Sequence, residues 1–434
     1  MAEKITGQVK IKRAIIKNIL AFKEEIIKSF NQEITKTIEI ILGGSIILDA
    51  SDIHIEPEEE GIKIRVRIDG ILHEVVILDQ RIYQILLSRI KLLSGLKLNI
   101  IDKAQDGRFS ILVSPAESGT NNKTEEIETR VSVLPSQYGE SIVIRILNPK
   151  SLIEIEDLGI REDMLEIFKK EIKKPNGMII VTGPTGSGKT TTLYAILKRL
   201  ENPEIKIITI EDPIEYHLEG ITQTQVAPEK GYDFANGLRA IVRQDPDVIL
   251  VGEIRDLDTA KTAIQAALTG HLVLTTLHTN DAAHTVARLQ ALGEIPINIA
   301  PAINIAIAQR LVRKICKKCV KFLSPTNEEL ETLEKELSLL PKEIKIPSLD
   351  KDLKIPKPTG CQFCNFTGYK GRIGIYEFFL VDDEIENFIL KSPSISDLKK
   401  IAEKKGMVSM RCDGLIKTLL GTTTIEEVNR VTSE

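Results

Sequence analysis

The sequence contains no tryptophan, and aromatic residues make up only 4% of its 434 residues. Proteins that bind single-stranded nucleic acid stack the bases on aromatic side chains and hold the backbone in a positively charged groove. The chain also lacks an excess of either charge, because its 58 basic residues nearly balance its 62 acidic residues. This composition argues against a dedicated nucleic-acid binder, and we expect no direct nucleic-acid binding.

Long apolar runs are absent as well. No stretch approaches the roughly 18 uninterrupted apolar residues that a membrane-spanning helix needs. The N-terminus does not open onto the apolar core of a signal peptide. We therefore expect a cytoplasmic protein. Its length exceeds what one ordinary hydrophobic core accommodates, so two or three domains are expected.

Cysteine is scarce, with five residues in the chain. Cys316 and Cys319 form one C-x-x-C pair, and Cys361 and Cys364 form a second pair further along. In a reducing compartment, two such pairs indicate a tetrahedral zinc site with four thiolate ligands rather than disulfides. Because all four ligands are protein side chains, the metal is expected to be structural. Cys412 is left over, and we expect it to be a small core residue.

Hydrophobic periodicity describes the first third of the chain. Residues 24–47 carry isoleucines at helical spacing, which predicts one amphipathic helix that packs on a core rather than on a partner or a membrane. Alternating apolar residues then predict a small α+β domain. Its expected elements are a hairpin that turns at Asp69-Gly70, a helix over residues 81–93, and strands at residues 109–113, 127–133 and 141–147.

Beyond residue 150, short apolar runs alternate with helical segments, which is typical of a parallel sheet covered by helices. The expected strands are residues 178–181, 205–210, 248–251 and 271–276. The patterns divide the chain into a helical segment (1–48), an α+β domain (49–150), an α/β core (151–315), a zinc-binding part with a charged insert (316–374) and a helical region (375–434).

One segment between an expected strand and an expected helix fits the G-x-x-x-x-G-K-[ST] pattern of a phosphate-binding loop. Glycines let backbone N–H groups turn inward around phosphate oxygens, and the helix N-terminus adds its positive dipole end. Lys189 is expected to reach the β and γ phosphates, and Thr190 to bind Mg²⁺. The expected nucleotide-binding residues are Gly183, Pro184, Thr185, Gly186, Ser187, Gly188, Lys189, Thr190 and the adjoining Thr191.

Hydrolysis also needs an acidic group that orients water, and open α/β sheets bind ligands at the carboxyl ends of their strands. Glu253 follows the expected strand 248–251 and is our first catalytic candidate. That strand does not end in the usual aspartate, so Mg²⁺ needs acidic help elsewhere. Glu211 closes the strand 205–210 and is expected to assist, although an acidic residue at such a position can also cap a helix.

Two histidines flank one expected strand, with His271 at its start and His278 just after it. A histidine in such a place can sense the γ phosphate or position water, and it can equally make a structural hydrogen bond. The neighbouring motifs favour the functional interpretation. We therefore include His278 among the catalytic candidates and His271 among the nucleotide-binding ones.

Several ordered segments together resemble the type II/IV secretion ATPases, in the branch often called GspE/PilB. Residues 208–216, 245–256 and 271–281 correspond to the Asp box, an atypical Walker B motif and the His box of that family. Residues 50–57 (ASDIHIEP) and 105–108 (QDGR) match the family's preceding domain. The resemblance implies a RecA-like P-loop motor domain in a hexameric ring, preceded by a smaller, PAS-like α+β domain.

The resemblance also gives roles to two arginines. It implies that Arg130 and Arg145 reach the γ phosphate from the smaller domain, where a guanidinium can donate two hydrogen bonds to phosphoryl oxygens. Without it, both would be ordinary strand arginines. The sequence departs from the family in a shorter segment at residues 99–105, in the long insert between the cysteine pairs, and in lacking the upstream domain common in this branch.

The function implied by the resemblance is ATP hydrolysis that powers type IV pilus assembly or type II protein secretion. The implied partners are further copies of the chain in a homo-hexamer and a membrane platform protein, which would hold the ATPase at the inner face of the cytoplasmic membrane. A four-cysteine subdomain is typical of assembly and secretion ATPases and generally absent from retraction ATPases. Two other classes stay open: a nucleic-acid translocase or DNA-uptake motor, and a nucleotide-binding regulator without turnover.

Overall fold

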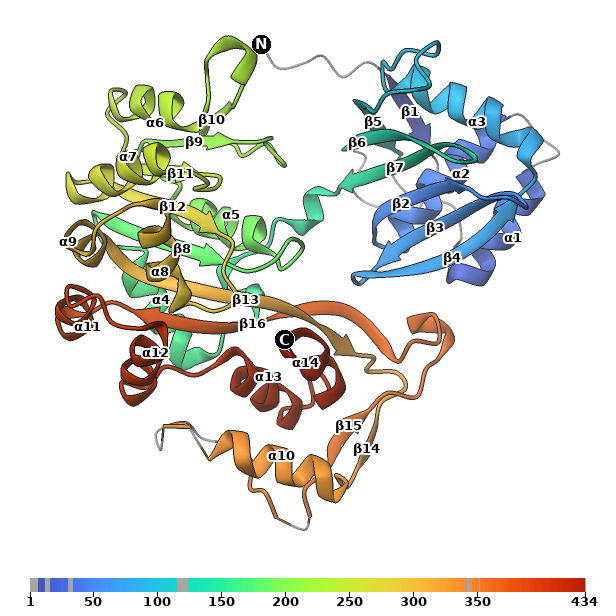
Figure 1. Cartoon of the computed structure of the whole chain (residues 1–434). Coiled ribbons are helices and arrows are strands. Elements are labelled where there is room, and N and C mark those ends of the chain that lie inside the picture. Colours follow the sequence, from blue (N-terminus) through green and yellow to red (C-terminus); the bar gives the residue numbers. More distant parts are fainter. Residues whose placement is uncertain are drawn as a thin grey trace. The chain divides into compact units, whose positions relative to one another are not determined.

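The computed structural model divides the chain into two compact units (Figure 1). Unit 1 contains residues 1–151 and 359–370, and unit 2 contains residues 152–358 and 371–434. The structure describes residues 7–11, 16–29, 34–114, 124–338, 340–341, 344, 346–350 and 352–433. The first six residues, where a signal peptide would begin, therefore lie outside the described part.

Unit 1 is built on a seven-stranded sheet in the order β1-β5-β6-β7-β2-β3-β4. The pair β1 and β5 is parallel, whereas the other neighbours are antiparallel. Buried and half-buried residues alternate along β3, as expected for a sheet with one face on the core. The strands are β1 (Gln8–Ile11), β2 (Ala50–Pro57), β3 (Ile62–Ile68), β4 (Ile71–Leu78), β5 (Gln105–Val113), β6 (Glu125–Ser136) and β7 (Gly139–Leu147).

The hairpin between β3 and β4 turns where the sequence predicts it. Asp69 and Gly70 have φ values of 50° and 85°, so both central residues of the turn are left-handed. A two-residue turn of this kind matches the twist of the two strands, and glycine takes up the left-handed conformation at no steric cost.

Among the described residues of unit 1, three helices accompany this sheet: α1 (Ile19–Ser29), α2 (Ile34–Ile47) and α3 (Gln80–Leu93). The single helix predicted over residues 24–47 is wrong, because α1 and α2 are separate helices that pack against each other. Phe30, which belongs to that prediction, lies outside the described residues. Ile26, Ile38 and Ile41 are buried in the core of unit 1, so the predicted core-facing stripe is confirmed at these positions.

Unit 2 is built on a second seven-stranded sheet in the order β10-β9-β11-β12-β8-β13-β16. The pairs from β10 to β13 are all parallel, which confirms the predicted parallel sheet. The strands are β8 (Gly177–Thr182), β9 (Ile207–Glu211), β10 (Thr222–Gln225), β11 (Val248–Val251), β12 (Leu272–Leu277), β13 (Ile303–Ile315) and β16 (Tyr369–Leu380).

Helices cover both faces of this sheet, which is why every residue of β8 is buried. Met178 and Ile180 pack toward the helices α6, α7 and α8, and Ile179 and Val181 pack toward α4 and α5. The helices are α4 (Glu162–Glu171), α5 (Lys189–Leu200), α6 (Phe234–Val242), α7 (Leu257–Leu268), α8 (His284–Leu292) and α9 (Pro296–Ile299), with short 3₁₀ turns at Ile155–Leu158, Pro228–Lys230 and Ala300–Ala302. Two further 3₁₀ turns, Pro149–Ser151 and Gln362–Cys364, belong to unit 1.

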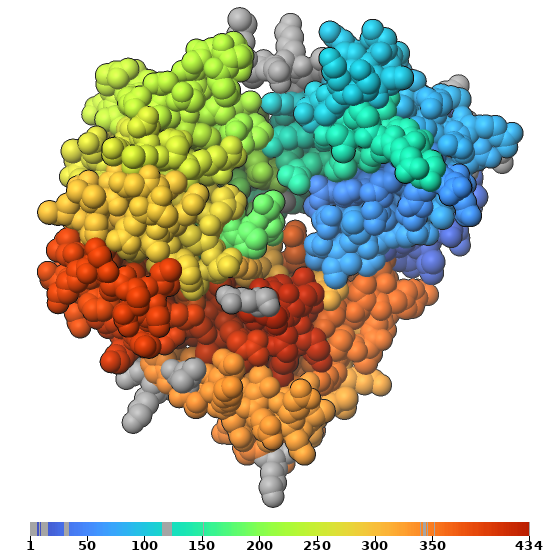
Figure 2. All heavy atoms as spheres, viewed as in Figure 1, coloured from blue at the N-terminus to red at the C-terminus, as the bar shows by residue number. Residues whose placement is uncertain are grey.

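The charged insert between the cysteine pairs forms α10 (Asn327–Leu337), and the strands β14 (Lys321–Leu323) and β15 (Ile355–Lys357) flank it. Thr326 caps α10 together with Glu329 in a capping box, which explains where the helix begins. Leu333 and Leu337 of α10 share a hydrophobic cluster with Leu415. The insert therefore packs on the C-terminal helices, as the space-filling view also shows (Figure 2).

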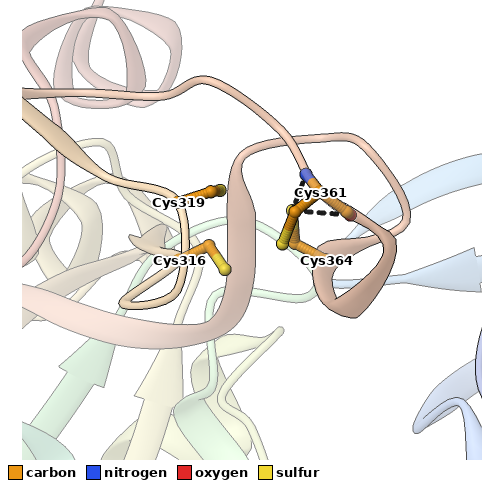
Figure 3. A group of neighbouring side chains, drawn as sticks. All are labelled: Cys316, Cys319, Cys361 and Cys364. Carbon is orange, nitrogen blue, oxygen red and sulfur yellow. Dashed lines mark hydrogen bonds between the residues drawn. The ribbon is translucent and has the colours of Figure 1, made fainter.

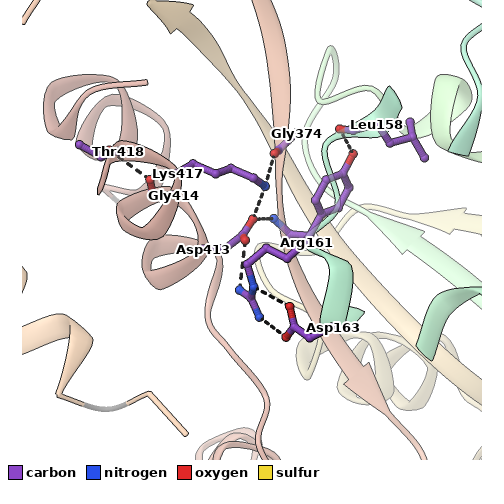
Figure 4. Close-up of polar contacts among 9 residues, drawn as sticks. Leu158, Arg161, Asp163, Gly374, Asp413, Gly414, Lys417 and Thr418 are labelled. Atoms are coloured by element: carbon purple, nitrogen blue, oxygen red, sulfur yellow. Dashed lines mark hydrogen bonds and ion pairs between the residues drawn. The ribbon is translucent and has the colours of Figure 1, made fainter. Parts of the chain in front are cut away.

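Four helices end the chain: α11 (Asp383–Ile389), α12 (Ile395–Lys404), α13 (Met410–Leu419) and α14 (Ile425–Thr432). A buried polar cluster holds α13 in place (Figure 4). Asp413, which is fully buried, lies 3.1 Å from Arg161 Nη1 and 2.6 Å from Lys417 Nζ, and it accepts from the backbone N–H of Tyr376. Arg161 also pairs with Asp163, so two carboxylates compensate the two cations. Within the described residues, no helix is long and apolar enough to cross a membrane.

Candidate functional site

The phosphate-loop pattern occupies the predicted setting, between the buried strand β8 and the helix α5. Gly183, Gly186 and Gly188 have φ values of 145°, 78° and 90°, which glycine adopts readily. A Cβ atom on Gly183 would lie 2.6 Å from the carbonyl oxygen of Gln309. The backbone can therefore follow this path only with glycine at this position.

Lys189 opens α5 and folds back over the loop. Its Nζ donates to the carbonyl oxygens of Gly183 at 2.9 Å and Pro184 at 3.1 Å. Burial lowers the pKa of Lys189, and the negative charges of Glu253 and Glu215 oppose that shift. The ammonium group thus lies where the first residues of the loop bend, and Glu253 is the carboxylate that most strongly favours its charged form.

Gln309 on β13 holds the loop against the first turns of α5, and it lies outside every predicted motif. Its Nε2 donates to the carbonyl oxygen of Ser187 at 2.8 Å, and its Oε1 accepts from Thr192 Oγ1 at 2.8 Å. Gln309 is fully buried. The signal available was an amide directly after the apolar run of residues 305–308, because a buried amide needs hydrogen-bond partners.

Glu253 follows β11 and lies beside His278, so the structure brings two of the predicted catalytic residues together. The Nε2 atom of His278 lies 3.4 Å from Glu253 Oε2, and Arg255 forms an ion pair with the other oxygen. The side chain of Glu253 is 15% exposed and that of His278 is 54% exposed. A partly shielded carboxylate beside an accessible imidazole can orient a water molecule and accept its proton.

The segment after β12 is tied directly to the end of β8. The backbone N–H of Thr279 donates to Thr182 Oγ1 at 2.8 Å, and the two hydroxyl groups lie 2.7 Å apart. Because the residue before the phosphate loop and the residue after His278 share these hydrogen bonds, the position of the imidazole is linked to that of the loop.

Glu211 ends β9 at the same sheet edge, but its oxygens point into protein. Oε1 accepts from Thr209 Oγ1 at 2.6 Å and from Gln223 Nε2 at 3.3 Å, and Oε2 accepts from the hydroxyl of Tyr194. Burial raises the pKa of Glu211, and these hydrogen bonds oppose the shift. The predicted magnesium role stays a prediction that requires one of these hydrogen bonds to open.

His271 is not brought to this site. It precedes β12, whose first residue Leu272 pairs with Gly177 at the start of β8. The phosphate loop follows the other end of β8, about 20 Å away for a strand of this length. The imidazole Nδ1 instead lies 2.9 Å from the carbonyl oxygen of Ala266 at the end of α7. Within this unit His271 therefore makes a structural hydrogen bond, which is the second of the two roles considered for it from the sequence.

Arg130 and Arg145 belong to unit 1, where they are direct neighbours on β6 and β7. The cross-strand pairing continues on both sides, so five residues form one row on one face of the sheet. In the order of the strands β5, β6, β7, β2 and β3, the row consists of Arg108, Arg130, Arg145, Asp52 and Arg67. This row holds four arginines and one aspartate, and Glu128 on the same face pairs with Arg108. The predicted contact of Arg130 and Arg145 with the γ phosphate stays a prediction.

The four predicted metal-binding cysteines lie together, and their side chains face one another (Figure 3). All four sulfur atoms are within 4.8 Å of one another, and those of Cys361 and Cys364 are 3.7 Å apart. A tetrahedral zinc ion with Zn–S bonds of about 2.3 Å places its sulfur ligands about 3.8 Å apart. Backbone N–H groups of Cys361 and Gly368 point at Cys364 Sγ, which favours a thiolate. The arrangement fits a structural zinc ion.

Cys412 on α13 lies in a different environment. It is buried, its thiol donates to the carbonyl oxygen of Glu336 at 3.3 Å, and burial raises the pKa of the thiol. A thiol with a raised pKa is a poor nucleophile, so these features agree with the expected core residue.

Comparisons with known proteins support the sequence resemblance. Residues 28–430 match the family described as "Type II/IV secretion system protein". The chain is 45% identical over 396 residues to the type IV pilus assembly ATPase PilB of Thermus thermophilus, covering 91% of this chain and 42% of that protein. It is 42% identical over 404 residues to the type II secretion system protein E of Xanthomonas campestris, covering 92% and 68%. The chain thus spans less than half of the Thermus protein.

Solved structures agree with these relatives in fold. The pilus retraction motor PilT with bound ADP is 27% identical, with a TM-score of 0.58, and the match covers 91% of this chain and 96% of that one. The ATPase DotB of Legionella pneumophila is 22% identical with a TM-score of 0.63, covering 91% and 94%, which shows likeness of fold. The predicted fold class, a P-loop α/β core with a smaller α+β domain and a helical C-terminus, is confirmed.

Proposed function

Because this chain belongs to the family of type II/IV secretion system proteins, we propose that it hydrolyses ATP to power pilus assembly or protein secretion. One observation carries the proposal: a phosphate loop of the right sequence and conformation shares its sheet edge with Glu253 and His278. A regulator without turnover needs the loop alone. The additional carboxylate and imidazole supply what hydrolysis requires.

In the proposed reaction, backbone N–H groups of the phosphate loop, Pro184 excepted, and the ammonium of Lys189 hold the β and γ phosphates. The hydroxyl of Thr190 would help to hold Mg²⁺, which would supply positive charge at the same oxygens. Glu253 accepts a hydrogen bond from a water molecule and aims its oxygen at the γ phosphorus. The new P–O bond forms as the bond to the bridging oxygen of ADP breaks, and the water proton leaves with phosphate or through Glu253.

The two arginines of unit 1 enter this proposal as partners in closure. When the smaller domain approaches a bound nucleotide, Arg130 and Arg145 add guanidinium donors to the γ phosphate and stabilise the charge of the transition state. Closure and opening would then follow the nucleotide cycle. We propose that a homo-hexamer passes this movement to a membrane platform protein at the inner face of the cytoplasmic membrane.

The cysteine cluster has a structural role in the proposal. Cys316, Cys319, Cys361 and Cys364 would hold one Zn²⁺, which links two distant turns of the chain and leaves no open position for chemistry.

Steady-state phosphate release and ATP binding of the Glu253→Gln variant test the proposed function. We expect ATP binding to persist and turnover to fall by at least about 100-fold, because the amide cannot accept the water proton. Glu204→Gln is the matched control, since Glu204 is an exposed acidic residue of the same unit. Normal turnover by Glu253→Gln, or no hydrolysis by the wild-type hexamer, contradicts the proposal.

A further inference from the structure

Arg310 lies next to the phosphate loop, in the same unit, and none of the motifs above includes it. The strand β13 is longer than its neighbour β8. Ala308 pairs with Thr182, the last residue of β8, so the next two residues of β13 run beside the loop that follows β8. Gln309 is the first of these residues and Arg310 is the second.

The guanidinium of Arg310 is fixed close to the start of the loop. Its Nη1 lies 3.2 Å from the point that a Cβ on Gly183 would occupy. It donates from Nη1 to the carbonyl oxygen of Gln309 and from Nη2 to that of Asn280, each at 3.1 Å. Lys189 Nζ donates to the carbonyl oxygen of the same Gly183 at 2.9 Å. Two cations therefore flank one glycine of the phosphate loop.

The positive charge at this place has no carboxylate in direct contact. Both hydrogen bonds of the guanidinium go to backbone carbonyls, and within the described part of the chain no carboxylate comes within 4.0 Å of it. Burial lowers the pKa of Arg310, with Glu377 and Asp281 opposing the shift. Its charge also contributes to the lowered pKa of Lys189, after burial. A half-buried pair of cations of this kind is relieved by an anion.

The hydroxyl of Ser187 gives a second, independent observation at the same place. Ser187 is 3% exposed, and its Oγ has no hydrogen-bond partner among the described residues. This Oγ lies 2.7 Å from the same Cβ point on Gly183. Buried hydroxyl groups are nearly always hydrogen-bonded, so the unpartnered donor indicates that an acceptor belongs here.

We propose that Arg310 binds the terminal phosphate of the nucleotide from within the same chain, next to Lys189. The assignment to the terminal phosphate follows from the position of Lys189, which reaches the β and γ phosphates in loops of this type. A guanidinium has five N–H donors, and the two hydrogen bonds to carbonyls leave others for phosphate oxygens. Because Arg310 shares a unit with the loop, its contact does not depend on domain closure. The inference rests on the proposed ATPase function.

Equilibrium binding of ATP and ADP to the Arg310→Gln variant tests the proposal, together with kcat and KM. Loss of a hydrogen-bonded charge at a phosphate is expected to weaken ATP binding about 10- to 100-fold. ADP lacks the terminal phosphate, so its affinity is expected to change less than about threefold. Arg310→Lys keeps the charge without the planar fork, and we expect it to bind ATP with an intermediate affinity.

Arg199→Gln is the matched control, because Arg199 is an exposed arginine at the far end of α5. Thermal unfolding checks that each variant is folded, and Arg310→Lys alone serves as the test if Arg310→Gln does not fold. Wild-type ATP affinity in the variant overturns the proposal, and so does an equal loss for ATP and ADP. Absence of hydrolysis by the wild-type protein would count against the proposed ATPase instead, since the binding measurements do not require turnover.

Discussion

Arg145 and Asp52 form an ion pair across the neighbouring strands β7 and β2, with Arg145 Nε 3.0 Å from Asp52 Oδ1. Arg67 approaches the other carboxylate oxygen at 3.5 Å from the opposite side. Asp52 is buried, whereas the side chain of Arg145 is 52% exposed. The aspartate therefore separates two arginines and keeps a row of like charges on one sheet face.

Replacing Asp52 with asparagine is expected to destabilise unit 1. The amide removes the negative charge and leaves adjacent arginines repelling one another, which should cost about 1–2 kcal/mol because both arginines stay partly exposed. Thermal unfolding of Asp52→Asn and of the wild type, at low and at high salt, measures the loss of stability. Glu58→Gln is the control, since Glu58 pairs with Lys63 at the surface and should change stability by less than about 0.5 kcal/mol. Equal stability of Asp52→Asn and wild type, or a loss that salt does not reduce, contradicts the expectation.

Gln309 is predicted to position the phosphate loop without contacting the nucleotide. Gln309→Leu keeps a similar volume but leaves the carbonyl oxygen of Ser187 and the hydroxyl of Thr192 without their partner. We expect kcat/KM for ATP to fall about 10- to 100-fold, because small displacements of such a loop are costly.

Gln309→Glu separates positioning from packing. Glutamate still accepts a hydrogen bond from Thr192 but cannot donate to the carbonyl oxygen of Ser187, so it should not restore kcat/KM. The control is Gln265→Leu at an exposed site on α7. Full activity of Gln309→Leu, or rescue by Gln309→Glu, would show that the amide does not hold the loop.

The features that the sequence predicts correctly depend on short segments. The strand–loop–helix setting of the phosphate-loop pattern and the hairpin turn at Asp69-Gly70 each follow from a strand and the residues just beyond its end. Local chemistry specifies these features, because strand ends in a parallel sheet meet at one edge.

The features that the sequence does not predict depend on strand register or on which end of a strand a residue occupies. Asp52 and Arg145 lie 93 positions apart, and only the pairing of β2 with β7 brings them together. His271 adjoins the expected strand, but it adjoins the amino end, opposite the loop. Gln309 becomes significant only because β13 extends past β8, and no local pattern states the length of a neighbouring strand.

Removal of the metal should destabilise the cysteine cluster, whereas ATP binding at the phosphate loop of the same chain should persist. We expect about one zinc per chain by elemental analysis, and we expect Cys361→Ser or Cys364→Ser to lower both zinc content and the melting temperature, because a structural site loses its closed tetrahedral shell. Cys412→Ser is the control, since Cys412 lies outside the cluster. Wild-type zinc content in Cys364→Ser would exclude a four-thiolate site.

Acid stability tests the environment of Glu427 on α14. Glu427 accepts hydrogen bonds from the backbone N–H and guanidinium of Arg313 and from Arg430. Burial raises the pKa of Glu427, but the bonds to Arg430 and Arg313 outweigh it and lower the pKa from 4.5 to about 2. A carboxyl whose folded-state pKa is depressed stabilises the protein above its unfolded pKa, and this contribution is lost as the pH falls from about 4.5 toward 2.

We therefore expect the wild-type melting temperature to fall across this pH window more steeply than that of Glu427→Gln, which has no proton to take up. At neutral pH we expect Glu427→Gln to be less stable than the wild type. Arg313 then loses its charged partner, in a site where Glu427 is only 2% exposed. Glu426→Gln is the neighbouring control, since Glu426 is exposed and contacts only the Lys357 ammonium in the described structure. Parallel pH profiles for wild type and Glu427→Gln would show that Glu427 does not carry this acid sensitivity.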